Sequence, residues 1–353
     1  MMRERGFTLV SLMVGLFVSM LVLLAVSGSG AFFETNRRQM ISGNAAFENA
    51  MATLLAMQRS TKQAGMAISL DGRLSCRSLN IFRSGVTRAN SAAAAPVLIG
   101  DGGDDSDTLT VTFADSLQAA MPAQSIRPMD ADDTSILVPN EIGFQVNDLI
   151  LVGAPGASTP CTLMQISSTA LSASPAGSRL LHEGPNDWNP ADRTTTFTTM
   201  PSYPTGSLVQ RVGNWNWLTY RVTDGRLEEV NNLTGGIDVI AEDIVYMKAA
   251  YGTTDGIGQT IEQWVPPVDP WDDPSLTQLN AVRAVLIAVV ARNPQRVKPS
   301  VAGGDCDATA SNSLELWPGG TVVDLSRVGA DWNCFTYRTL RLAVPLRNVI
   351  FGS

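Results

Sequence analysis

Residues 7–26 read FTLVSLMVGLFVSMLVLLAV, and the rest of the chain has to be arranged around this run. Its twenty residues include no charged side chain. As an α-helix the run is about 30 Å long, which matches the hydrocarbon thickness of a bilayer. The preceding leader, MMRERG, carries Arg3 and Arg5, and the positive-inside rule keeps such an end in the cytoplasm. The sequence therefore predicts a transmembrane helix over residues 7–27.

Two other kinds of N-terminal segment also contain an apolar run: a cleaved secretory signal peptide and an uncleaved signal anchor. A cleaved secretory signal peptide has an apolar run of about 7–15 residues and a small-x-small cleavage site after it. The run here is longer, and a helical pattern continues beyond it. An uncleaved signal anchor stays open, and with it a membrane-anchored periplasmic enzyme or ligand-binding domain.

The helical pattern continues to about residue 63. Residues 28–63 are expected to form an amphipathic half of the same helix, with Gly28 and Gly30 permitting a local bend. Gly65, shortly after Lys62, is a suitable C-cap. The apolar stripe expected to pack on the protein's own sheet consists of Met40, Phe47, Met51, Leu54 and Leu55.

The remaining residues, 64–353, predict an extracytoplasmic head domain rich in antiparallel β-structure. Alternating or continuous apolar runs predict strands at 107–114, 149–152, 161–166, 207–212, 217–222, 226–230, 244–251, 281–291 and 335–350. Asp224-Gly225 is a strong hairpin signal between two of these runs. The run at 281–291 is almost entirely apolar, which is typical of a central strand covered on both faces. The fold class is therefore α+β.

Four cysteines fit two disulfides if this domain lies outside the reducing cytoplasm. Three pairings are possible, and free buried thiols remain an alternative. The preferred pairs are Cys306 with Cys334, which closes a short C-terminal loop, and Cys76 with Cys161, which are the two cysteines that remain.

Composition disfavours nucleic-acid binding, metal binding and catalysis. The net charge is -8, and no Lys/Arg cluster exceeds three residues. The only histidine, His182, has no nucleophile motif around it, so we expect no cofactor and no enzymatic role. The acidic segments at 101–107 and 130–133 lack Ca²⁺-loop spacing and are expected to be solvated turns. The seven tryptophans are expected to cap the core, with a partner-binding surface as the alternative.

The boundary between leader and apolar run reads G-F-T-L-V-x-L-M-V and resembles the type IV prepilin signature. The resemblance implies that prepilin peptidase cuts between Gly6 and Phe7 and that the new terminal Phe7 is N-methylated. It also implies that the first residues of the mature helix, Thr8, Leu9, Val10, Ser11 and Leu12, take part in helix-core assembly. The family usually has Glu at the fifth mature position, where this chain has Ser11.

The C-terminal third is similar to PilW-type minor pilins. The similarity is carried by residues 236–244 (GIDVIAEDI), Tyr251-Gly252, residues 282–286 (VRAVL), Tyr337-Arg338 and residues 345–348 (PLRN). Residues 75–205 carry no such resemblance. The implied architecture is a type IV pilin-like fold with a leader at 1–6, a long helix at 7–63 and a head at 64–353.

The resemblance also implies a role and partners. The role is that of a minor pilin in type IV pilus assembly or initiation, with a minor pseudopilin of type II secretion as the alternative. Implied partners are other minor and major pilins, prepilin peptidase, the inner-membrane assembly platform and a tip adhesin. The implied location is the inner membrane, with the head in the periplasm, and then the extracellular pilus that drives twitching motility.

Overall fold

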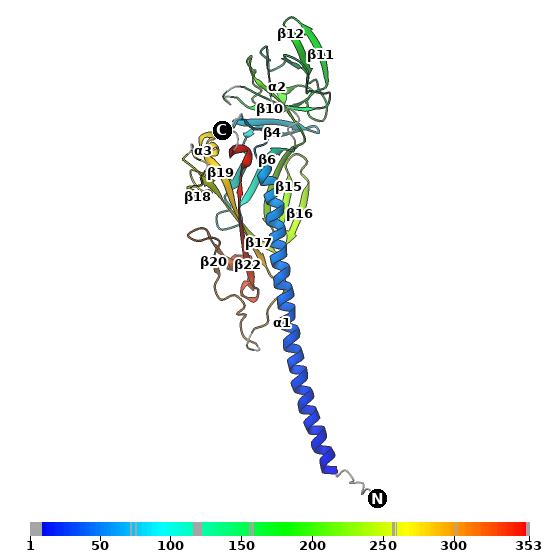
Figure 1. Ribbon diagram of the computed structural model, residues 1–353, viewed down its shortest axis with the longest axis vertical. Helices are drawn as coiled ribbons and strands as arrows, with labels where there is room; N and C mark the ends of the chain where they lie inside the picture. The colour runs from blue at the N-terminus through cyan, green and yellow to red at the C-terminus, as the bar shows by residue number, and fades with distance from the viewer. Residues whose placement is uncertain are drawn as a thin grey trace.

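The computed structural model describes residues 9–70, 73–74, 76–115, 122–154, 156, 159–255, 258, 260–299, 301 and 303–350. A long helix, α1 (Leu9–Gln63), extends like a stalk from a β-rich head (Figure 1). The N-terminal half of α1 lies beyond the head, and the C-terminal half lies against it. This arrangement agrees with the expected long helix and sheet-rich head.

Helix α1 is continuous over 55 residues. It passes through Gly28 and Gly30 without a break in helical structure, so the glycines interrupt nothing here. The helix ends as expected, because Gly65 adopts a positive φ of 83° and its N–H donates to the Thr112 carbonyl at 3.0 Å.

A four-stranded antiparallel sheet packs against the C-terminal half of α1. Its order is β18 (Gln263–Val265), β17 (Ile244–Thr253), β19 (Val282–Arg292) and β22 (Tyr337–Pro345). On one face of β19, Val285, Ile287 and Val289 share a core with α1. On the other face, Ala288 and Val290 pack with the segment around residues 314–325. The prediction of a central strand covered on both faces is therefore confirmed.

A five-stranded antiparallel sheet adjoins this core. Its order is β16 (Ile237–Glu242), β15 (Arg226–Asn231), β14 (Trp215–Thr223), β6 (Thr108–Ala114) and β5 (Val97–Gly100). The predicted hairpin is confirmed, since β14 pairs with β15 across Asp224 and Gly225, whose φ values are 51° and 73°.

The end of the head remote from the stalk contains two further sheets. One has the order β4 (Val86–Ala93), β3 (Ser78–Arg83), β10 (Cys161–Gln165), β9 (Leu149–Gly153), β13 (Leu208–Val212) and β7 (Ala123–Gln124). The other has the order β11 (Ser168–Ala173), β12 (Ala176–Leu181) and β8 (Ser135–Val138). Strands β3 and β10 pair in parallel, within a head whose other described strand pairs are antiparallel, in agreement with the predicted antiparallel-rich head. A parallel pair needs a long connection, and here the partners lie about 80 residues apart.

Short elements complete the head. They are β1 (Ser69–Leu70), β2 (Arg73–Leu74), α2 (Arg193–Thr196), α3 (Leu276–Ala281), β20 (Ser313–Glu315), β21 (Val322–Asp324), η2 (Leu325–Val328), η3 (Trp332–Cys334) and α4 (Arg347–Ile350).

The face of α1 that packs on the head differs from the predicted stripe. Small and medium side chains are buried there: Ala46, Ala50, Thr53, Leu54, Met57 and Thr61, followed by Ala64 directly after the helix. Of the predicted stripe, Leu54 is buried, whereas Phe47, Met51 and Leu55 are exposed. The Met40 side chain lies outside the described part of the chain. Alanines on the buried face let the helix backbone approach the sheet closely, which the larger residues would prevent.

Two disulfides join Cys76 to Cys161 and Cys306 to Cys334, the two pairs preferred from the sequence. The first attaches the segment before β3 to the start of β10. The second ties η3 to the loop that follows β19.

Candidate functional site

The N-terminal half of α1 is an apolar rod that no other described part of the chain covers. Every large apolar side chain described between Leu9 and Val26 is 52–76% exposed. These side chains point to all sides of the helix, because apolar residues occupy nearly every position. A helix that is apolar all round is stable only when lipid or other protein surrounds it. The rod, defined here as residues 9–26, is therefore a surface for burial in another environment.

The Ser19 hydroxyl, the one polar side chain of the rod that the structure describes, is satisfied within the helix. The Ser19 hydroxyl donates to the carbonyls of Gly15 and Leu16 at 2.7 and 3.0 Å. Just beyond the rod, the Ser27 hydroxyl donates to the Leu24 carbonyl at 3.0 Å. Such bonds to the preceding turn leave these hydroxyls with no need of water. The rod can thus enter an apolar environment without burying an unpaired polar group at these positions.

Most residues around the predicted cleavage point lie outside the part of the chain that the structure describes. Gly6, Phe7 and Thr8 are outside the described residues, as is the side chain of Ser11. Leu9, Val10 and Leu12 are in the first turns of α1, and 58–76% of each is exposed. These three side chains therefore belong to the uncovered rod.

A membrane-spanning helix was expected over residues 7–27. Within the described ranges, the structure contains no helix with the length and hydropathy required to cross a bilayer.

A second exposed apolar surface lies on the part of α1 that is attached to the head. It consists of Phe47, Met51 and Leu55, which are 47%, 39% and 53% exposed and follow each other at intervals of one turn. Phe47 also lines a groove of about 280 Å³ between α1 and β22, together with Arg338 and Leu340. Exposed apolar surface is thus present on the helix beside the head as well as on the rod, where a neighbouring helix could cover it.

His182 is a buried structural residue in the remote end of the head. It follows β12, and its side chain is fully buried. Arg193 Nη1 donates to His182 Nδ1 at 2.8 Å, and Arg193 Nη2 donates to the Asp133 carbonyl. Burial, reinforced by the positive charge of Arg193, lowers the pKa of His182 to about 3. The imidazole is therefore neutral and accepts from Arg193, which in turn bonds the 130–133 loop.

Sequence reasoning found His182 but not its partner Arg193. Asp192 precedes Arg193 as the N-cap of α2, and its carboxylate accepts from the Thr194 N–H at 2.8 Å. This capping pattern is the local signal for the short helix. Nothing in the sequence near Arg193 indicates that its guanidinium is buried.

The acidic segment at 101–107 is a largely exposed turn, as predicted, except that Asp107 is buried. Asp107 forms a buried ion pair with Lys248 at 2.8 Å, and Arg327 pairs with Asp104 and Asp105 at the surface. In the part of the chain described, no group of three His, Cys, Asp or Glu side chains is placed to hold a metal ion. The segment therefore joins β6 to β17 and η2.

All seven tryptophans are buried or half-buried in the head. Trp188 and Trp215 are the most buried, at 8% and 3% exposed. The Tyr251 and Trp271 ring centroids lie 5.4 Å apart. The expectation that the tryptophans cap the core agrees with these positions.

Comparison with known proteins gives one match that bears on function. Residues 1–27 match the family model described as the prokaryotic N-terminal methylation motif. A similar solved structure is a type IV-like pilin from Thermus thermophilus, at 10% identity, 86% coverage of this chain, 95% coverage of that chain and a TM-score of 0.35. A similarity at that TM-score carries no argument here. No curated protein matches the chain.

Proposed function

We propose that this chain is a structural subunit of a type IV pilus-like filament, of the minor pilin kind. The observation that carries the proposal is the match of residues 1–27 to the methylation motif, since the same segment contains the uncovered apolar rod. A structural rather than a catalytic role is part of the proposal. A minor pseudopilin of type II secretion is the alternative, because that role uses the same N-terminal processing.

The proposed mechanism is an exchange of environments for the rod. Before assembly, the uncharged run that begins at Phe7 anchors the chain in the inner membrane, with the head in the periplasm. After the leader is removed, the rod leaves the lipid and packs against the rods of neighbouring subunits. Apolar contacts are present in both environments, so the driving force is close packing between helices rather than escape from water.

The proposed modification takes place at Gly6 and Phe7. Prepilin peptidase cuts between these residues and methylates the new terminal amine of Phe7. Cleavage on the cytoplasmic side of the run removes the charges of Arg3 and Arg5 and leaves the whole rod intact. The further partners in this proposal are other minor and major pilins, the inner-membrane assembly platform and a tip adhesin.

Ser11 suggests where the subunit stands in the filament. In pilins, the Glu usual at this position is thought to pair with the terminal amine of a neighbouring subunit. A buried charge is tolerated only when it is paired, so Ser11 leaves a neighbour's amine uncompensated. A place at the filament tip, where one neighbour is missing, removes that cost. Immunogold labelling spread along the shaft would contradict this placement.

The decisive experiment is mass spectrometry of the mature N-terminus. Protein from cells with active prepilin peptidase is expected to begin at N-methylated Phe7, and protein from peptidase-deficient cells at Met1. A Gly6→Val variant is the control, because a branched side chain at the cut site should block processing in both strains. An intact leader in peptidase-positive cells, or a cut after the apolar run, would overturn the proposal.

A further inference from the structure

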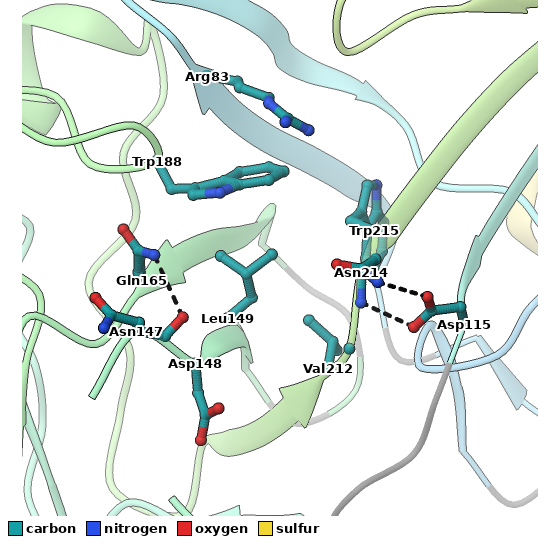
Figure 2. Close-up of a pocket in the computed structure, with 11 residues that line it drawn as sticks. Arg83, Asp115, Asn147, Asp148, Leu149, Gln165, Trp188, Val212, Asn214 and Trp215 are labelled. Carbon is teal, nitrogen blue, oxygen red and sulfur yellow. Dashed lines mark hydrogen bonds between the residues drawn. The ribbon is translucent and has the colours of Figure 1, made fainter. Parts of the chain in front are cut away.

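The head contains a pocket where the six-stranded and five-stranded sheets meet (Figure 2). Its volume is about 380 Å³. Leu149 on β9 and Val212 at the end of β13 form its apolar floor, and the indoles of Trp188 and Trp215 stand on opposite sides. The size is within the usual range for small-molecule sites and is sufficient for one or two sugar rings.

The walls of the pocket are held in place by contacts within the protein, which are present before any ligand binds. The Arg83 guanidinium lies 4.6 Å from the centroid of the Trp188 ring and covers one side of it. The backbone N–H of Trp188 donates to Asn186 Oδ1 at 2.9 Å, which fixes the loop that carries the indole. In addition, the Cys76–Cys161 disulfide secures β10, the strand that contributes Gln165. Because these walls are already ordered, ligand binding loses less conformational entropy.

The acidic side chains of the pocket are also fixed. Asp148 is paired with Arg211, with Nε 2.7 Å from Oδ2. Asp115 accepts from the N–H and the side-chain amide of Asn214 at 2.9 and 2.7 Å. Arg83 faces Asp187 at 3.8 Å. Charge in and around the pocket is therefore largely compensated within the protein, which favours a neutral ligand over an anion or a cation.

Several polar groups of the lining are left for a ligand. The side-chain amide of Asn147 has no hydrogen-bond partner among the described residues, and Gln165 uses only its Nε2, which donates to the Asn147 carbonyl at 3.3 Å. The indole N–H of Trp215, in a side chain 97% buried, also has no acceptor in the described part of the chain. This N–H is itself inaccessible to solvent, so the partly or fully exposed side-chain amides of Asn147 and Gln165 are the polar groups that a ligand can reach.

We propose that this pocket binds a neutral carbohydrate of one or two pyranose rings. Such a ligand combines apolar C–H faces, which suit the floor and the indoles, with hydroxyl groups that both donate and accept, which suit the amides. The strands that line the pocket lie at the end of the head remote from the free end of α1 (Figure 1). The site is thus accessible with the rod buried, and the proposal does not depend on the function proposed above.

The test uses the full chain, solubilised in a detergent without a sugar headgroup, on an array of neutral, sialylated and sulfated glycans. The native chain is expected to retain a subset of neutral glycans, and titration calorimetry with the best of them gives its Kd. The Gln165→Ala variant, which removes one amide without disturbing the backbone bonds of β10, should weaken binding roughly fivefold to tenfold. The Asn147→Gly variant should act similarly, since glycine suits the positive φ of 73° at this position.

The matched control is Gln263→Ala, which removes an exposed glutamine from β18, outside the pocket. It should bind like the native chain. The proposal is overturned if the array retains no glycan, if it retains only charged glycans, or if Gln165→Ala and Asn147→Gly both bind as tightly as the control. Near-native denaturation midpoints for both variants would show that any loss is local to the pocket.

Discussion

His182 shows how one side chain can have a purely structural role although its type is common in catalytic sites. Its ring is buried, and its Nδ1 accepts a hydrogen bond from Arg193. A protonated imidazole could not accept that bond, and it would place a second positive charge beside the guanidinium. The neutral ring is therefore the form that the folded head requires.

A pH-dependent loss of stability follows from the lowered pKa of His182. The pKa is about 3 in the folded protein, against a usual value of 6.5, so the unfolded chain binds the additional proton between these values. The contribution is complete above pH 6.5 and falls as the pH is lowered toward 3, at up to about 1.4 kcal/mol per pH unit. Urea unfolding at several pH values measures it.

A His182→Asn variant isolates this effect, because the Asn carbonyl can accept from Arg193 but does not titrate. The variant should lack the part of the pH dependence that His182 contributes, and the difference between the two curves reports it. His182 is the only histidine in the chain, so its NMR signals can be assigned without ambiguity. Titration of the folded ring near pH 6.5 would disprove the interpretation.

At the scale of elements, helix α1 carries two different surfaces. The described side chains of the rod, residues 9–26, are exposed on all sides, and the C-terminal half of α1 buries a face made largely of alanine and threonine. Simple periodicity of large apolar residues selected Phe47, Met51 and Leu55 as the packing face, yet these side chains are exposed. Small residues pack where the sheet comes closest, and the large ones remain available for contacts with other molecules.

Two nearby alanines of α1, Ala50 and Ala52, test which face of the helix packs on the head. Ala50 is completely buried against the head, whereas Ala52 is exposed. Ala50→Leu should lower the free energy of unfolding by about 1–3 kcal/mol, because the larger side chain overpacks the interface. Ala52→Leu should change it by no more than about 0.5 kcal/mol. Denaturation followed by tryptophan fluorescence compares the two, and equal effects would contradict the observed helix face.

At the scale of the whole molecule, the sheets of the head are connected by a few buried contacts. Asp107, immediately before β6, accepts from the Ala249 N–H at 2.9 Å and from Lys248 Nζ at 2.8 Å. Both side chains are almost entirely inaccessible, at 2% and 5% exposed. The ion pair therefore joins the five-stranded sheet to the four-stranded sheet that supports α1.

Breaking this pair from one side should destabilise the head strongly. Lys248→Met leaves the Asp107 carboxylate buried without its cation and is expected to cost about 3–5 kcal/mol. The double variant Lys248→Met, Asp107→Asn should be less destabilised than Lys248→Met alone, because the Asn side chain is neutral and still accepts from Ala249. A double-mutant cycle by chemical denaturation measures the coupling, and strictly additive effects would show that the pair does not join the sheets.

Local patterns in the sequence predicted much of the fold. Uninterrupted apolar character located β19, Asp224-Gly225 located a hairpin, and Gly65 located the end of α1. The cysteine pairs were also anticipated. Each of these signals depends on chemistry within a few residues, or on a small number of possible pairings, so each is readable before the chain is folded.

Other features became visible only in three dimensions. The parallel pairing of β3 with β10, the contact between His182 and Arg193, and the pocket beside Trp188 and Trp215 all join segments whose sequences give no sign of one another. The exposed rod, in contrast, follows directly from an uncharged run that the head never covers. Local chemistry decides which residues form a helix or strand, but the choice of packing partners depends on shape and burial across the whole chain. The apolar surface of the N-terminal helix can therefore be read from its residues, while the architecture of the head depends on its long-range contacts.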